Sequence, residues 1–155
     1  MALMMEAGTP CGAFGATLQQ FGALPWRRSR SGGIEILLIT TRRTGRWILP
    51  RGWPVKAKTP AQTAAREAFE EAGVIGSVDP RPVGEYSYVK TLADGSENDC
   101  LVTLFSLQVH GTLVNWPERN QRQRRWHGLD QACEAASDRQ LAGLLATLDW
   151  NRKAA

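Results

Sequence analysis

Residues 66–74 read Arg-Glu-Ala-Phe-Glu-Glu-Ala-Gly-Val and place three carboxylates on one short helix. At about 100° per residue, Glu67, Glu70 and Glu71 fall together on one side of that helix. The opposite side is an apolar stripe suited to docking on a core, formed by Ala61, Ala64, Ala65, Ala68, Phe69 and Ala72. Because like charges three and four residues apart repel each other, we expect a cation among the carboxylates. Oxygen donors favour a hard divalent ion, with Mg2+ preferred.

The ends of this helix are marked independently of its carboxylates. Thr59 is the expected N-cap, Pro60 stands at the first helical position, and Gln62 completes a capping box. Gly73 stands where a left-handed residue is expected to end the helix. The sequence therefore predicts a helix over residues 60–72.

The flanking sequence predicts strands on both sides of this helix. Before it, strands are expected at residues 22–27, 34–41 and 47–49, followed by irregular chain rich in proline and glycine through residue 58. After it, we expect a hairpin of residues 82–91 and 100–109, a short strand at 123–127 and an amphipathic helix at 139–150. This order of elements predicts an α+β fold arranged as an α/β/α sandwich.

Length and composition indicate one domain in a cytoplasmic protein. The chain has 155 residues, enough for one core, and we place the domain at residues 21–150 after a flexible N-terminal tail at residues 1–20. Cys11, Cys100 and Cys133 are odd in number and widely separated, as expected of reduced thiols. No stretch approaches the roughly 20 apolar residues of a membrane span, so no membrane partner is expected. Nothing in the sequence indicates an oligomeric state.

The positive charge of the chain is concentrated in three arginine clusters, at residues 27–30, 42–46 and 119–125. The planar guanidinium group suits paired contacts with phosphate oxygens. Near one acidic metal site, such clusters predict a polyphosphorylated small molecule as substrate, although any single arginine is equally well explained as a solvated turn residue. Nucleic acid is disfavoured as a partner, because the chain carries no recognised binding motif and little aromatic interleaving.

From Gly52 onward the chain resembles the Nudix box, whose pattern is Gly, five residues, Glu, seven residues, then Arg-Glu-apolar-x-Glu-Glu-x-Gly-apolar. The matching residues are Gly52, Arg66, Glu67, Ala68, Glu70, Glu71, Gly73 and Val74. The exception is Lys58, which stands where the family has its first glutamate. The resemblance covers about residues 22–148 and implies a mixed central sheet, a catalytic loop and helix, and a C-terminal helix.

Outside the box the chain resembles the branch that contains diphosphoinositol polyphosphate phosphohydrolases and diadenosine polyphosphate hydrolases. The residues that carry this resemblance are residues 37–43, Arg46, Trp47, Trp116 and residues 124–126. It implies hydrolysis of a diphosphate linkage in a polyphosphorylated small molecule. Two alternatives remain open, which are a non-catalytic nucleotide-binding module and an RNA 5′-end pyrophosphohydrolase.

The resemblance also implies a role for each box residue. Glu67 and Glu71 would bind Mg2+, or alternatively Mn2+, together with the backbone carbonyl of Arg51. Glu70 would be a third ligand or the base that deprotonates the attacking water. Arg66 lies four residues before Glu70 and is placed to orient its carboxylate.

The expected substrate-binding residues are Arg27, Arg42, Arg43, Gly52, Trp53, Lys58 and Arg124. Trp53 is interpreted either as a platform for a substrate ring or as an anchor that fixes its loop to the core.

Lys58 reverses the charge of a position that supports the metal site in the family. One interpretation is that Lys58 contacts substrate phosphate or solvent while the other carboxylates suffice. The other is a degenerate box that binds a nucleotide without turning it over. Replacement carboxylates are available at Glu85, Glu97, Asp99 and Glu118. Glu118 is the best candidate for an additional base, against the simpler interpretation of a solvated loop residue.

Overall fold

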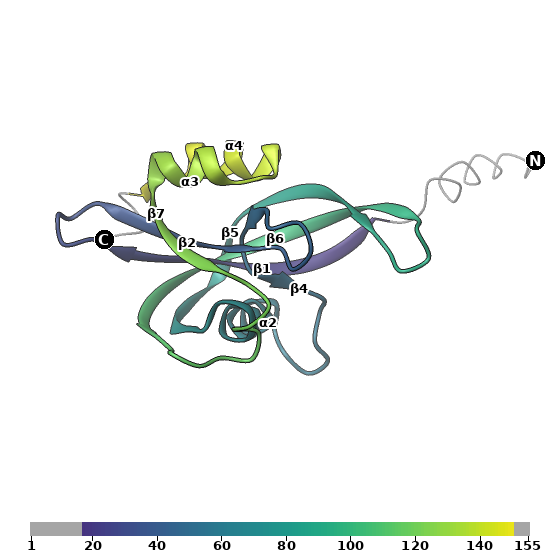
Figure 1. Ribbon diagram of the computed structural model, residues 1–155, viewed down its shortest axis with the longest axis horizontal. Helices are drawn as coiled ribbons and strands as arrows, with labels where there is room; N and C mark the ends of the chain where they lie inside the picture. Colours follow the sequence, from purple (N-terminus) through teal and green to yellow (C-terminus); the bar gives the residue numbers. More distant parts are fainter. Residues whose placement is uncertain (1–16, 151–155) are drawn as a thin grey trace, which may run out of the picture.

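A computed structural model describes residues 17–150 of the chain. Figure 1 shows a sheet with one layer of helices on each side, α3 and α4 on one face and α2 on the other. The predicted α+β fold and its α/β/α layering are therefore confirmed.

The sheet has seven strands and is mixed. Its strands are β1 (Leu18–Arg28), β2 (Ile34–Thr40), β3 (Trp47–Ile48), β4 (Arg51–Gly52), β5 (Val74–Thr91), β6 (Glu97–Thr112) and β7 (Arg124–Gly128). The order is β3-β2-β1-β6-β5, with β4 paired to β1 and β7 paired to β2. Only the β1 and β6 pairing is parallel among the described strands.

The helices are α2 (Pro60–Glu67), its π-helical continuation η2 (Ala68–Ala72), α3 (Leu129–Ala135) and α4 (Arg139–Thr147). Both predicted caps of the box helix are confirmed. The Thr59 hydroxyl accepts the Gln62 N–H at 3.1 Å, and the Gln62 side chain accepts the Thr59 N–H at 2.9 Å. Gly73 ends η2 in the left-handed region, with φ 65°.

The π-helical turn changes which side chains face the core. At about 100° per residue, Phe69 and Glu71 lie at opposite borders of the alanine stripe, about 80° on either side of its centre, so uniform α-helical spacing favours the burial of neither. In the structure Phe69 is 40% exposed, whereas Glu71 is only 7% exposed. The wider turn of η2 alters the angular spacing of its residues, so the expected position of Phe69 in the docking stripe is wrong.

The central strands are buried on both faces because each helix layer covers one face. Along β1, Ala23 contributes to the core under α2 and its neighbour Leu24 to the core under α4. Leu37 and Leu38 divide in the same way along β2. This alternation explains why residues 34–40 form an almost continuous apolar run.

Three features differ from the expectations. β1 begins at Leu18, inside the tail predicted at residues 1–20. Residues 1–16 of that tail lie outside the described part of the chain. The region expected to be irregular contains β4, because Gly52 and Arg51 pair with Phe21 and Gly22 of β1. A further helix, α3, precedes α4. These differences depend on pairings between distant segments, which local patterns do not encode.

Two glycines with the same backbone conformation test how tightly the end of η2 is packed. Gly73 has φ 65°, and a Cβ there would lie 2.6 Å from the Arg124 guanidinium and 2.6 Å from the Trp116 ring. Gly45 has φ 66° with nothing within 4 Å of the same position. We expect Gly45→Ala to lower the free energy of unfolding by about 1 kcal/mol through backbone strain alone, and Gly73→Ala to lower it by at least about 2 kcal/mol. Urea unfolding measures both values, and equal losses would contradict this packing.

Candidate active site

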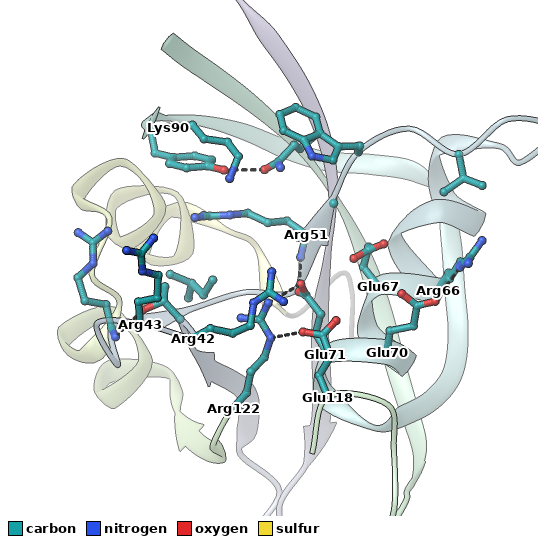
Figure 2. A pocket seen from close by; sticks show the side chains of 18 of the residues that line it. Arg42, Arg43, Arg51, Arg66, Glu67, Glu70, Glu71, Lys90, Glu118 and Arg122 are labelled. Atoms are coloured by element: carbon teal, nitrogen blue, oxygen red, sulfur yellow. Dashed lines mark hydrogen bonds and ion pairs between the residues drawn. The ribbon is translucent and has the colours of Figure 1, made fainter. Parts of the chain in front are cut away.

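A cavity of about 1020 Å³ opens beside η2 and is bordered by both acidic and basic side chains. Its walls come from the turn between β2 and β3, from β4 and the loop after it, from α2 and η2, from β5, and from the loop before β7. Figure 2 shows the acidic residues of the helix facing the basic residues across this cavity. The fold thus brings together segments spread over much of the chain.

Glu71 is the buried carboxylate of the site, and both of its oxygens are occupied. Its Oε1 accepts the backbone N–H of Arg51 at 3.0 Å. Its Oε2 accepts Nη2 of Arg122 at 2.9 Å, in an ion pair with side chains only 7% and 9% exposed. Arg122 also donates through Nε to Glu118 at 2.8 Å and through Nη1 to the carbonyl of Thr40 at 3.0 Å. The guanidinium group is therefore fixed between two carboxylates.

Glu67 is only partly exposed and accepts no hydrogen bond from any residue that the structure describes. Its carboxylate lies directly against the Cα of Gly52, where any Cβ would collide with it. Burial, followed by the charges of Glu70 and Glu118, raises the pKa of Glu67 to about 7. Burial also raises the pKa of Glu71 to about 7, although Arg122 and the Arg51 N–H act in the opposite direction.

Arg66 and Glu70 form the contact expected from their spacing. Nε of Arg66 donates to Oε1 of Glu70 at 2.9 Å, with side chains 47% and 31% exposed. An ion pair this exposed contributes little to stability, but it orients the Glu70 carboxylate at the edge of the cavity.

Within residues 17–150, no group of three His, Cys, Asp or Glu side chains is already arranged to hold a metal ion. The donor chemistry nevertheless fits a hard divalent cation, because four carboxylates border one cavity, namely Glu67, Glu70, Glu71 and Glu118. The half-buried Glu67 carboxylate accepts no hydrogen bond from a described residue, so its negative charge is poorly compensated. Glu67 and Glu71 are the residues best placed to hold such an ion. To bind it, Glu71 would have to exchange its contact with Arg122 for a contact with the cation.

The opposite wall is basic and includes two of the predicted substrate ligands, Arg42 and Arg43, together with Arg46. Nη1 of Arg42 donates to the Gln121 side chain at 3.1 Å. Trp53 also borders the cavity and is 44% exposed, so it does not serve simply to fix its loop to the core.

Three predicted substrate ligands do not border this cavity: Arg27, Lys58 and Arg124. Arg27 instead pairs with Glu35 at 2.8 Å and lies over the Trp126 ring. Lys58 is exposed in the loop before α2. Their separation from the carboxylates corrects the expectation that they gather at the site.

Arg124 has a structural position instead. It donates to the carbonyls of Ala72, Gly73 and Leu113 and lies 3.8 Å from the Trp116 ring centroid. The third arginine cluster therefore divides between two tasks, since Arg122 enters the cavity and Arg124 holds the end of η2. Two further cavity residues, Lys56 and Lys90, have no distinctive signal in the sequence.

Of the proposed replacement carboxylates, only Glu118 borders the cavity; Glu85, Glu97 and Asp99 do not. The loop that carries Glu118 is attached to the box helix, because the Glu118 N–H donates to the carbonyl of Glu70 at 3.0 Å. This position disfavours the simple interpretation of Glu118 as a solvated loop residue. The spacing of four residues between Glu118 and Arg122 is the sequence signal that could have indicated their ion pair.

A family model described as NUDIX domain matches residues 19–147. The chain belongs to the NUDIX family. Nudix hydrolase 12, mitochondrial, of Arabidopsis thaliana is 33% identical over 104 residues, which cover 65% of this chain and 51% of the relative. Nudix hydrolase 21, chloroplastic, of the same plant is 34% identical over 124 residues, covering 75% and 58%. The chain thus spans about half the length of these curated NUDIX relatives.

Solved structures share the NUDIX fold at low sequence identity. A C. elegans Ap4A hydrolase superposes with a TM-score of 0.63 at 19% identity, covering 90% of this chain and 100% of the other. The NUDIX domain of Shewanella oneidensis NrtR, crystallised with ADP ribose, gives a TM-score of 0.64 at 15% identity, with both chains fully covered. Among the described residues, no helix is long and apolar enough to cross a membrane.

The raised pKa of Glu67 predicts a pH-dependent effect of Glu67→Gln. The ordinary pKa of 4.5 applies to the unfolded chain, and the folded value is about 7, so the ionised carboxylate destabilises the fold fully above pH 7. This cost decreases as the pH falls and disappears below pH 4.5. We expect Glu67→Gln to raise the free energy of unfolding by about 1 kcal/mol at pH 8, after allowance for solvent screening, and to leave it nearly unchanged at pH 4.5.

Denaturant unfolding at the two pH values, without added metal, checks this expectation. Glu97→Gln is the matched control, because Glu97 is exposed and lies outside the cavity. An equal gain in both variants would argue against the environment assigned to Glu67.

Proposed function

We propose that this NUDIX chain is a metal-dependent pyrophosphohydrolase that cleaves a diphosphate linkage in a polyphosphorylated small molecule. The observation that carries the proposal is one cavity bordered on one side by four carboxylates and on the other by arginines. A cation held by the carboxylates and a chain of phosphates held by the arginines fit together in such a space. The substrate type is a diadenosine polyphosphate or a diphosphoinositol polyphosphate. The names of the plant relatives and of the Ap4A hydrolase support hydrolysis as the reaction.

Glu67 and Glu71, with the backbone carbonyl of Arg51, would hold Mg2+, or alternatively Mn2+. When bound, such an ion neutralises phosphate oxygens and makes water easier to deprotonate near neutral pH. Glu70 would accept the proton of the attacking water or act as a third ligand, with Arg66 holding its carboxylate in place. On the basic wall, Arg42 and Arg43 would bind phosphate oxygens. Trp53 offers an exposed ring at the edge of the same cavity, and Gly52 leaves room for Glu67 beside the loop.

A second candidate is a nucleotide-binding module without turnover. It is favoured by the contact of Arg122 with Glu71 and Glu118, which already neutralises part of the acidic wall. A cytoplasmic location also remains a prediction, since the relatives are named mitochondrial and chloroplastic.

Substitution of the box carboxylates tests the hydrolytic assignment. A panel of diadenosine polyphosphates, nucleoside triphosphates, nucleotide sugars, triphosphorylated RNA and inositol pyrophosphates is incubated with Mg2+ or Mn2+, and the products are identified. We expect Glu70→Gln and Glu71→Gln each to lower kcat by at least about 100-fold, the usual contribution of a positioned base or ligand. Glu97→Gln keeps full activity. If both box variants remain fully active, the residue roles are wrong, and nucleotide binding without turnover by the unsubstituted protein would identify the second candidate.

The basic wall gives a separate prediction about binding. If Arg42 contacts a phosphate equally in the ground and transition states, Arg42→Ala raises KM by about tenfold with kcat nearly unchanged. The control is Arg81→Ala, whose side chain is 87% exposed outside the active-site cavity. Steady-state kinetics on the best substrate of the panel measures both constants. A fall in kcat at constant KM would show that Arg42 acts on the chemical step instead.

A further inference from the structure

Arg51 connects the carboxylate site to the helix layer on the other face of the sheet. Its backbone N–H donates to Oε1 of Glu71 at 3.0 Å, on the α2 side. Its side chain runs the opposite way, and Nη1 donates to Oδ2 of Asp138 at 3.1 Å and to the Tyr86 hydroxyl at 2.9 Å. The guanidinium carbon also lies 3.7 Å from the Tyr88 ring centroid. Figure 2 shows the backbone of Arg51 next to Glu71, with the side chain directed away.

Asp138 is used in an unusual way for its position. It is the N-cap residue of α4, where an aspartate normally accepts a backbone N–H of the first helical turn. The Asp138 side chain makes no such capping bond, and its carboxylate pairs instead with Arg51, with side chains 15% and 10% exposed. The Asp138 carboxylate at the start of α4 therefore binds Arg51 instead of capping the helix.

The strand held in this way is short, although the residue before it, Pro50, also accepts the Ala23 N–H at 3.0 Å. β4 consists of Arg51 and Gly52 alone and pairs with only two residues of β1. Yet both of its residues set carboxylate positions, since Arg51 N–H bonds to Glu71 and the Cα of Gly52 lies against Glu67. A small displacement of β4 therefore moves the surroundings of both expected metal ligands.

We propose that Asp138 and the Arg51 side chain are positioning residues, which fix β4 from the α4 side and thereby set the geometry of Glu71 and Glu67. In this role each group acts through the backbone of β4. The consequence for metal binding rests on the proposed function, whereas the consequence for the Arg51 N–H does not. Removing partners that lie behind metal ligands typically weakens metal binding by 10- to 100-fold.

The test uses Asp138→Asn, which keeps the shape of the side chain and removes its charge. Amide hydrogen exchange of the whole chain is followed by NMR, and Mn2+ affinity is measured by calorimetry. We expect the Arg51 amide to exchange about tenfold faster and Mn2+ to bind about tenfold more weakly, while amides of β6 such as Leu104 are unchanged. The control Glu35→Gln breaks the more exposed Arg27 pair, which lies outside the cavity, and leaves both readouts unaltered.

A second variant, Arg51→Met, shows whether Asp138 acts through Arg51. If it does, the double variant Arg51→Met with Asp138→Asn exchanges at residue 51 no faster than Arg51→Met alone. Unchanged exchange of the Arg51 amide in Asp138→Asn, an equal acceleration at Leu104, or additive effects in the double variant would each overturn the inference. If the unsubstituted protein hydrolyses nothing or binds no Mn2+, the proposed function fails, and amide exchange still decides this inference.

Discussion

Burial of the Glu71 carboxylate is the constraint around which the site is organised. Burying a carboxylate away from water costs free energy unless its oxygens accept hydrogen bonds. The Glu71 oxygens accept one from the Arg51 N–H and one from the Arg122 guanidinium group. One partner comes from the short strand before the box helix and the other from the loop before β7. Three of the segments that border the cavity are therefore joined at a single side chain.

The same site contains an unequal distribution of charge. Arg122 compensates Glu71 and Glu118, whereas Glu67 accepts no hydrogen bond from the described residues and its pKa is about 7. A cation that binds beside Glu67 would have to displace protons and would compete with Arg122 for Glu71. We therefore expect the metal affinity of this cavity to depend on pH.

The sequence predicted the local features of the site better than its long-range contacts. The Thr59 cap, the Gly73 terminus and the Arg66–Glu70 contact depend on residues within four positions of one another, and all three are present. The burial of Glu71 was missed because it depends on pairing with Arg51 and Arg122, which lie far from it in the sequence. Arg122 and Arg124 look equivalent in the sequence, and only the packing of β7 and its preceding loop separates them. β4 exists because β1 lies beside it, which no pattern near Gly52 reveals.

The parallel pairing of β1 with β6 has a consequence for how the chain folds. β1 pairs with β6 from Leu18 opposite Cys100 to Trp26 opposite Gln108. This central strand near the start of the domain can therefore meet its neighbour only after the box helix and β5 have been synthesised. Such non-local pairing requires closure of a long loop and slows folding. During synthesis, one edge of β1 stays open until β6 has left the ribosome. The strand that organises the finished sheet is thus among the last to be fully paired.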